Sequence, residues 1–307
     1  LFIPGPRFAR ALAKLAPQLT ASAERWRTAG PWLWGAAATI ALVALVWLAD
    51  LSPARTIAAM LPDNARSAMG GQVVKSISEG RAFCEEPAGL NALNKLTDRL
   101  VTAAHVDRPF KVDVNDWALD NAFATPGENI VLTRGLLEAG EGPDEIAGVL
   151  AHEMGHGIEL HPETGLVRAM GLAAAAELLM GGGGTLGNIG IVLLQLSYSR
   201  EAEGQADDHA VAILRDAGIS SKGFAQFFER MSKRHGGSGG ALGKGGLGGM
   251  LSSHPDTDKR LTKVLRSSGY EATPALSRKE WSALQSICTK TASSASESPI
   301  STDDKDQ

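Results

Sequence analysis

The chain has 307 residues, enough for one large domain or two modest ones. Hydrophobic residues make up 44% of it, so a sizeable core can be buried. Lysine and arginine together number 30 against 34 aspartates and glutamates. This near balance argues against a nucleic-acid-binding surface, which usually carries a basic excess.

The first fifty residues carry the pattern of a membrane anchor. No charged residue occurs between Arg27 and Asp50, and a helix that crosses a bilayer needs about 20 predominantly apolar residues. Five basic residues and one acidic residue precede this stretch. The positive-inside rule therefore places residues 1–30 in the cytoplasm, a transmembrane anchor over 31–50, and the rest of the chain on the other side. Tryptophans, which gather at membrane interfaces, lie near both ends of the stretch: Trp32, Trp34 and Trp47.

Two other interpretations of the apolar stretch are weaker. A cleaved signal peptide would need a small residue where Trp47 stands if cleavage followed Ala49. A helix buried in a protein core would explain neither the tryptophans nor the uneven charge. We therefore expect a retained single span.

Beyond the anchor, the sequence predicts one mainly helical domain. We expect a linker and an entering helix over 51–80, a globular domain over 81–290 and a disordered tail over 291–307, where Ser, Asp and Thr dominate. Residues 165–196 are nearly uncharged and are interrupted by a run of glycines. A second membrane span is one interpretation, but the glycines and the short arms beside them favour a helical hairpin that lies on the domain or dips into the membrane surface.

Local patterns give the elements of an α+β, mainly α, fold. Alternating residues at 110–114 predict a strand, and Pro126-Gly127 between two extended arms predicts a hairpin over 121–134. Apolar spacing and start signals predict helices elsewhere: 90–104, 144–160, 197–216, 221–234, 256–267 and 277–288.

The two cysteines, Cys84 and Cys288, are far apart and form no metal-binding C-x-x-C pair. They are either unrelated buried thiols or a single disulfide that joins the start of the globular part to its end. The disulfide requires an oxidising compartment.

Residues 152–156 read His-Glu-Met-Gly-His and match H-E-x-x-H. On a helix, His152 and His156 lie on one face, so both imidazoles can bind one ion. Zinc accepts histidine nitrogen and carboxylate oxygen, and a catalytic site keeps one position for water. Glu153 can approach that open side and take a proton from the water. The alternative is a pair of core-facing histidines that flank a surface glutamate.

A third ligand has to come from elsewhere, because the extended three-histidine pattern is absent. His161 follows the motif closely, and we expect it to point away from the metal face. The acidic segment 198–207 follows the apolar stretch, which would return the chain to the metal. Glu203 and Asp207, spaced i and i+4, can supply one ligand and one group that orients a ligand histidine. Glu201 is expected to face solvent.

Three segments resemble the membrane-associated zinc metallopeptidases that include the HtpX-type quality-control peptidases and the CAAX prenyl endopeptidases. They occur in the family's order and cover residues 90 to about 265. The segments are Asn121-Ala-Phe-Ala-Thr-Pro-Gly127 with Leu132-Thr-Arg-Gly-Leu-Leu137, Ala151-His-Glu-Met-Gly-His156, and Ser199-Arg-Glu-Ala-Glu-Gly-Gln-Ala-Asp207.

The resemblance implies a zincin-like core with a small β-hairpin or sheet beside the metal helix and one Zn2+ per chain. It implies that Glu203 is the third ligand and that Asp207 stands behind it. His254, in a His-Pro element, either touches the metal or stabilises the transition state; otherwise it only begins a helix before Pro255. The resemblance also implies a strand at the cleft to which substrate adds: Asn121, Ala122, Phe123 and Ala124.

The resulting hypothesis is a membrane-anchored zinc metalloendopeptidase in protein quality control of the cell envelope. Its expected partners are protein or peptide substrates, such as misfolded envelope proteins, and not nucleic acid. We expect a single-pass protein of the bacterial inner membrane with its catalytic domain in the periplasm. The alternative location is the mitochondrial inner membrane, facing the intermembrane space. The competing function is a chaperone-like or binding module that keeps the zinc site with little proteolysis.

Overall fold

The structure is a computed structural model that describes residues 5–15, 29–41, 52–78, 80–171, 197–236, 254 and 257–289. It divides into two compact units, Leu1–Pro53 and Ala54–Gln307. The predicted tail (291–307) and residues 172–196 of the predicted helical hairpin lie outside the described residues.

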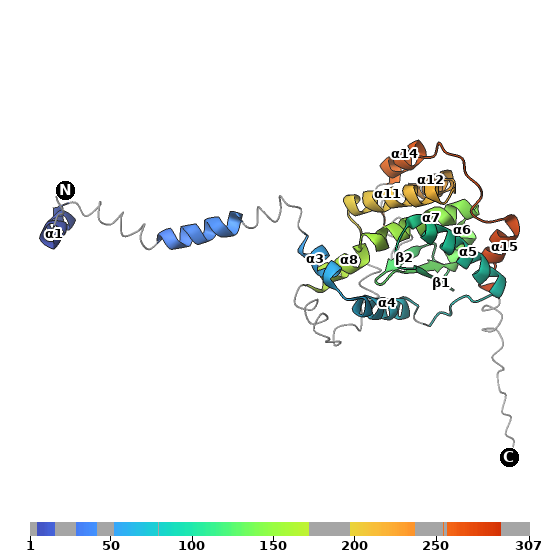
Figure 1. The fold of residues 1–307 in the computed structure, drawn as a ribbon, viewed down its shortest axis with the longest axis horizontal. Helices are drawn as coiled ribbons and strands as arrows, with labels where there is room; N and C mark the ends of the chain where they lie inside the picture. Colours follow the sequence, from blue (N-terminus) through green and yellow to red (C-terminus); the bar gives the residue numbers. More distant parts are fainter. Residues whose placement is uncertain are drawn as a thin grey trace, which may run out of the picture. The chain divides into compact units, whose positions relative to one another are not determined.

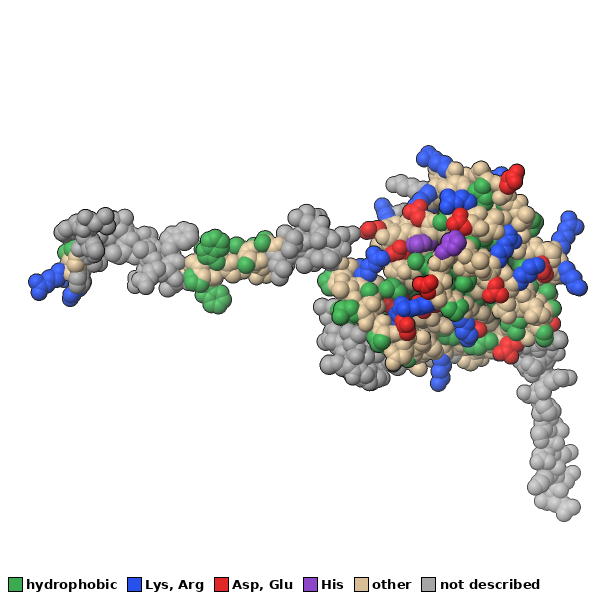
Figure 2. Space-filling model, in the orientation of Figure 1, with side chains coloured by type: hydrophobic (Ala, Val, Ile, Leu, Met, Phe, Trp, Pro, Cys, Tyr) green, Lys and Arg blue, Asp and Glu red, His purple; other side chains and the backbone are tan. Residues whose placement is uncertain are grey.

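The first unit contains two described helices, α1 (Pro6–Leu15) and a helix over residues 29–41. Bulky apolar side chains project from the second helix (Figure 2): Trp32 is 82% exposed and Trp34 is 79% exposed. Among the described residues, no helix is both long enough and apolar enough to cross a membrane. Residues 42–50 of the predicted anchor lie outside the described part.

The second unit is mainly helical and contains one small sheet (Figure 1). The predicted strand, hairpin and helices are present, with ends that differ from the expected ones by a few residues. The elements are α3 (Pro53–Met60), α4 (Asp63–Ile77), α5 (Pro87–Ala104), β1 (Lys111–Asn115), β2 (Ala122–Thr125), β3 (Asn129–Thr133), α6 (Arg134–Ala139), α7 (Pro143–Ile158), α8 (His161–Met170), α11 (Arg200–Asp216), α12 (Lys222–Gly236), α14 (Thr257–Arg266) and α15 (Arg278–Gln285).

The three strands lie in the order β1-β3-β2. β2 and β3 form the expected antiparallel hairpin, and β1 pairs with β3 in parallel, with Lys111 opposite Asn129. Helix α7 lies on one side of the sheet and α4 on the other (Figure 1). All four residues of β2 are buried, because side chains on both faces of this strand meet a helix.

Helix α7 carries the H-E-x-x-H motif through the middle of the unit. Pro143 occupies its first turn, where a missing N–H is tolerated. Asp144 and Glu145 favour the same end, because helix N-termini carry a partial positive charge. Every residue from Glu145 to Gly157 is buried, since α11, α12 and the sheet all pack against this helix.

Helices α7 and α11 approach each other closely at Gly155. A Cβ at this position would lie 2.7 Å from the carbonyl oxygen of Ala206 and 2.9 Å from its Cα. The glycine inside the motif therefore allows backbone contact between the helix with the two histidines and the helix with Glu203.

Cys84 and Cys288 are joined by a disulfide. The N–H of Cys84 donates to the carbonyl of Val114 in β1, at 2.8 Å. Cys288 follows α15, which packs against α5. Of the two alternatives that the sequence left open, the structure contains the disulfide, which ties the two ends of the domain across 204 residues.

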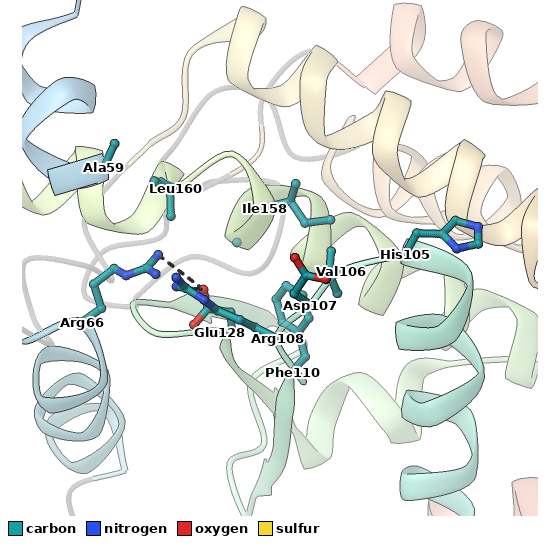
Figure 3. A pocket seen from close by; sticks show the side chains of 11 residues that line it. Ala59, Arg66, His105, Val106, Asp107, Arg108, Phe110, Glu128, Ile158 and Leu160 are labelled. Carbon is teal, nitrogen blue, oxygen red and sulfur yellow. Dashed lines mark hydrogen bonds and ion pairs between the residues drawn. The ribbon is translucent and has the colours of Figure 1, made fainter. Parts of the chain in front are cut away.

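A pocket of about 470 Å³ opens beside the turn between β2 and β3 (Figure 3). Glu128 of this turn lies 3.4 Å from the guanidinium of Arg66 and 3.3 Å from that of Arg108. Neither motif histidine lines this pocket. It is therefore separate from the site described next.

Candidate metal centre

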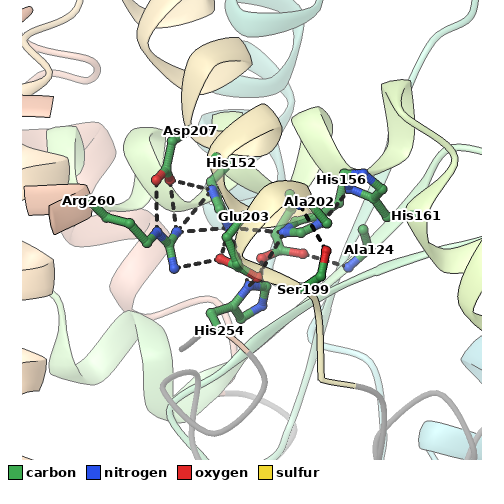
Figure 4. Close-up of polar contacts among 12 residues, drawn as sticks. Ala124, His152, His156, His161, Ser199, Ala202, Glu203, Asp207, His254 and Arg260 are labelled. Atoms are coloured by element: carbon green, nitrogen blue, oxygen red, sulfur yellow. Dashed lines mark hydrogen bonds and ion pairs between the residues drawn. The ribbon is translucent and has the colours of Figure 1, made fainter. Parts of the chain in front are cut away.

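Four buried side chains from three parts of the chain converge beside α7 (Figure 4). His152 and His156 project from α7, Glu203 projects from α11, and His254 lies shortly before α14. Each side chain offers one donor atom, and these four atoms all lie within 4.8 Å of one another. No other cluster of this kind occurs among the described residues.

The separations between the donor atoms suit a small ion with four ligands. Nε2 of His152 lies 3.1 Å from Nε2 of His156 and 3.3 Å from Nδ1 of His254. Oε1 of Glu203 lies 2.9 Å from Nδ1 of His254 and 3.6 Å from Nε2 of His156. Zinc–nitrogen distances of about 2.0–2.1 Å imply a tetrahedron with edges of about 3.3–3.4 Å. The donor set and its dimensions therefore fit zinc.

The outer nitrogen of His152 supports the same assignment. Its Nδ1 lies 3.0 Å from Oδ1 of Asp207, and an ionised carboxylate only accepts hydrogen bonds. Nδ1 therefore carries a hydrogen, and Nε2 is the nitrogen whose lone pair a neutral His152 can offer to a metal. Lone pairs and a carboxylate that converge in this way repel one another unless a cation lies among them.

The pKa values of the two motif histidines show that the cluster favours positive charge. Burial opposes a charge on His152, but hydrogen bonds to Asp207 and Glu203 outweigh it and raise its pKa to about 9. Burial lowers the pKa of His156 well below its ordinary value, and the nearby charge of His152 adds to this effect. A positive charge on His152 is thus stabilised, whereas burial disfavours one on His156.

Arg260 of α14 contacts both Asp207 and Glu203 of α11 (Figure 4). Its Nε and Nη2 each lie 2.8 Å from an oxygen of Asp207, and its Nη1 lies 2.5 Å from Oε2 of Glu203. Burial acts to raise the pKa of Asp207, but hydrogen bonds from His152 and Arg260 outweigh it and lower that pKa. Burial acts in the same way on Glu203, and His254 and His152 hold its pKa well below its usual range. Both carboxylates are therefore ionised.

Glu153 lies beside the cluster and is 1% exposed. Its Oε2 accepts a hydrogen bond from the backbone N–H of Ala124 in β2, at 2.8 Å. Its Oε1 has no hydrogen-bond partner and lies 3.6 Å from Nε2 of His254. Burial raises the pKa of Glu153. A buried carboxylate with a raised pKa, next to a set of metal donors, is suited to accept a proton during a reaction.

Residues 90–268 match the family described as Peptidase family M48. The match covers more than half of the chain and includes every residue of the cluster. The chain belongs to peptidase family M48. The cofactor of this metallopeptidase family is zinc, in agreement with the donor set.

Several known proteases are similar to part of this chain. Metalloprotease LoiP of Escherichia coli is 32% identical over 152 residues, which are 47% of this chain and 57% of LoiP. Mitochondrial metalloendopeptidase OMA1 of Arabidopsis thaliana is 30% identical over 142 residues, 46% of this chain and 28% of OMA1. Beta-barrel assembly-enhancing protease of Escherichia coli is 26% identical over 217 residues, 62% and 45% of the two chains. The matched part thus spans about half or less of each relative.

The surroundings of His156 in this M48 chain differ from the sequence-based expectation. His161 lies outside the donor set, as expected, but it contacts a ligand histidine. Its Nδ1 lies 2.9 Å from Nδ1 of His156, on the side of the ring opposite to the cluster. The ring of Tyr198 stacks on His156 with a centroid distance of 4.1 Å. The two residues in contact with His156 lie close to the motifs in sequence: His161 follows the H-E-x-x-H motif, and Tyr198 precedes the segment that contains Glu203.

The structure brings the predicted site residues of this M48 domain together. Asp207 lies behind His152, and the β2 strand lies beside Glu153. Glu201 is exposed as expected, and His209 contacts Glu159 at 2.9 Å with its side chain one-third exposed.

Arg260 and Tyr198 were not predicted from the sequence as site residues. Arg260 shares one face of the predicted helix with Val264, which is fully buried. A charged residue on an inward face was the available signal.

Proposed function

We propose that this M48 chain is a membrane-anchored zinc metalloendopeptidase that hydrolyses internal peptide bonds. One observation carries the proposal: Glu153 lies, buried, against a four-donor cluster that contains His152, His156 and Glu203. In this assignment His152, His156 and Glu203 hold the zinc, and Asp207 orients His152.

Bound zinc supplies a Lewis acid that polarises the scissile carbonyl and lowers the pKa of water. Glu153 accepts a proton from the attacking water and later delivers it to the leaving amine. Before substrate binds, the N–H of Ala124 holds one oxygen of Glu153, and the other oxygen has no hydrogen-bond partner. Asp207 keeps the hydrogen of His152 on Nδ1, and Arg260 holds Asp207 in place through two hydrogen bonds.

We assign substrate binding to the outer edge of β2. Within the described residues, β2 is the last strand of the sheet. The N–H of Ala124 donates to Glu153, and that of Ala122 donates to the side chain of Asn121. A peptide that adds as a further strand replaces such bonds with its own. The substrate and the general base therefore meet at Ala124. Phe123 lies between Ala122 and Ala124, the two residues whose N–H groups are available to the peptide.

His254 would supply a fourth protein donor to the zinc, where a catalytic site keeps one position for water. Its Nδ1 belongs to the donor cluster, and its side chain is 2% exposed. A fourth protein ligand closes a zinc site, whereas hydrolysis needs an open position. We therefore assign this arrangement to a guarded form, from which His254 withdraws when substrate enters.

The envelope of a bacterial cell is the location that we assign to the protein. The uncharged stretch before Asp50, with its tryptophans and its basic flank, supports a single-pass anchor in the inner membrane. The disulfide of Cys84 and Cys288 supports an oxidising compartment, such as the periplasm, for the catalytic domain. One relative is named as a protease that enhances β-barrel assembly, which supports quality control of envelope proteins. The alternative location is the mitochondrial inner membrane, because OMA1, one of the similar proteins, is a mitochondrial metalloendopeptidase.

A second candidate function follows from the closed donor set. A zinc site with four buried protein ligands has the form of a structural site. On this basis the chain would act as a chaperone-like or binding module with little proteolysis. Proteolysis by the purified protein distinguishes the two functions.

The Glu153→Gln variant tests the proposal. We expect it to keep its zinc, because Glu153 is not among the donors, and to lose roughly 10²–10⁴-fold in casein turnover, as for other general bases. Casein hydrolysis and zinc content are measured on the full chain in detergent. Equal casein turnover by the parent and the variant would show that Glu153 is not the base.

A further inference from the structure

His156 has a second imidazole behind it. Its Nδ1 lies 2.9 Å from Nδ1 of His161, and Nε2 of His161 lies 3.1 Å from Oε1 of Gln205. His161 is partly buried at the first position of α8, and Figure 4 shows its ring behind that of His156, away from Glu203. It does not belong to the donor cluster.

Gln205 fixes the direction of the hydrogen bonds in this series. Its Oε1 only accepts, so Nε2 of His161 donates to it. A neutral His161 then presents a lone pair at Nδ1 and accepts the hydrogen of Nδ1 of His156. That hydrogen leaves the lone pair of His156 on Nε2, the nitrogen that faces the donors. The opposite direction would put a hydrogen on the nitrogen that has to bind the metal.

The two motif histidines therefore have unlike partners behind them. His152 donates to the carboxylate of Asp207, which Arg260 braces. His156 donates to a neutral ring. The hydrogen bonds behind His152 end at Asp207, and those behind His156 pass through His161 and end at Gln205. Both end residues lie on α11, which also supplies Glu203 to the cluster. One helix thus provides a donor and orients both histidines of α7.

We propose that His161 is a positioning residue that orients His156 for zinc binding and that Gln205 selects the tautomer of His161. The proposal rests on the zinc site of the proposed function but does not require peptidase activity. Groups that hold the outer nitrogen of a ligand histidine typically contribute about 10–100-fold to metal affinity. Loss of the acceptor at His161 is therefore expected to weaken zinc binding by this factor.

Two substitutions of similar size separate hydrogen bonding from packing. In His161→Asn, the amide oxygen takes the place of Nδ1 and can still accept from His156. In His161→Leu, the side chain fills similar space without an acceptor. We expect His161→Leu to bind zinc about 10–100-fold more weakly than the parent and His161→Asn to stay much closer to the parent. Zinc affinity is measured by competition with a fluorescent chelator on the full-length, zinc-free protein.

His209→Leu is the matched control, because His209 is a partly exposed histidine of α11 that contacts Glu159 and is not one of the four donors. Its zinc affinity should equal that of the parent. The absorption bands of bound Co2+ should shift in His161→Leu and not in His209→Leu. Parent affinity in His161→Leu, or equal losses in the Leu and Asn variants, would overturn the proposal.

Gln205→Leu keeps the proposal testable if His161→Leu does not fold. This change removes the acceptor that fixes the tautomer of His161, so we expect a smaller but measurable loss of zinc affinity. Parent affinity in Gln205→Leu would contradict the proposed selection of the tautomer. A parent protein that binds zinc without cleaving casein would contradict the proposed function and leave the role of His161 standing.

Discussion

Each motif histidine directs one nitrogen toward the donor cluster and the other toward a partner that orients the ring. The spacing of four residues on α7 explains why both Nε2 atoms converge. The same spacing on α11 lets Glu203 reach the cluster while Asp207, one turn later, reaches the outer nitrogen of His152. The shared face of the two histidines could be predicted from the geometry of one helix. The spacing on α11 left open which acid binds the metal, and only the family resemblance implied Glu203 as the ligand with Asp207 behind it.

His254 can be tested by its removal. In the His254→Ala variant the fourth donor is absent, so water and substrate can reach the metal without displacing a side chain. We expect casein turnover to rise several-fold, while zinc stays bound through the three remaining donors. Initial rates and zinc content of the two proteins are compared. A fall in turnover with zinc retained would instead assign His254 to stabilisation of the transition state.

Arg260 marks the limit of prediction at the scale of single residues. It lies 53 positions after Asp207, on a different helix, and contacts it only because α14 packs over α11 and α12. No local spacing connects the two residues. His161 shows a related limit: the sequence predicted only that it points away from the metal face, and did not predict its contact with the outer nitrogen of His156.

Among the elements, the contact of α7 with α11 at Gly155 sets the distance between the histidines and Glu203. A Cβ there would meet backbone atoms of Ala206, which cannot rotate away. We expect Gly155→Ala to lower the free energy of unfolding by about 1–3 kcal/mol, as for other overpacked sites, and to weaken zinc binding by displacing Glu203. Urea unfolding and chelator competition measure the two effects.

Gly204→Ala is the control for this substitution. Gly204 lies next to Glu203, but a Cβ there would meet nothing within 4 Å. Because alanine favours helix over glycine by about 1 kcal/mol, this variant should be as stable as the parent or more so, with unchanged zinc affinity. If both alanine variants behave alike, close approach at Gly155 does not set the site's geometry.

The turn between β2 and β3 rests on a buried carboxylate of α8. Oε1 of Glu163 accepts the N–H of Gly127 at 3.1 Å, whereas its Oε2 is buried without a partner. Burial raises the pKa of Glu163 from 4.5 to about 7. The folded protein therefore binds this proton more tightly than the unfolded chain. Stability falls as the pH rises from about 4.5 to about 7 and then levels off.

Glu163→Gln should remove this loss of stability. The gap between the two pKa values corresponds to about 3 kcal/mol at most. The difference in free energy of unfolding between variant and parent should therefore shift in favour of the variant between pH 5 and pH 8. Urea unfolding at several pH values measures it, with Glu85→Gln, at an exposed carboxylate, as the control. A difference that does not change with pH would contradict the raised pKa.

At this scale the sequence predicted local elements well and their partners less well. Pro126-Gly127 identified the hairpin of β2 and β3 because a turn is encoded by its own residues. The parallel pairing of β1 with β3 was not predicted. It joins strands separated by other residues, and their relative placement depends on packing against α5 and α7.

For the whole molecule, the disulfide is the feature with the longest reach. It links Cys84, before β1, to Cys288, after α15, and so closes nearly the entire metallopeptidase domain into one covalent loop. Such a bond stabilises a fold mainly by restricting the unfolded chain. Sequence alone left the pair undecided, because bonding depends on the approach of α15 to α5.

The central claim is that the buried cluster holds the zinc on which peptide hydrolysis depends. Its most direct test measures zinc per chain and casein hydrolysis together, in the parent, in Glu203→Gln and in Glu201→Gln. We predict about one zinc per chain and casein cleavage for the parent and for Glu201→Gln, whose altered side chain is exposed. Glu203→Gln should lose most of its zinc and its activity while remaining folded by circular dichroism. Full zinc content and undiminished cleavage in Glu203→Gln would contradict the claim.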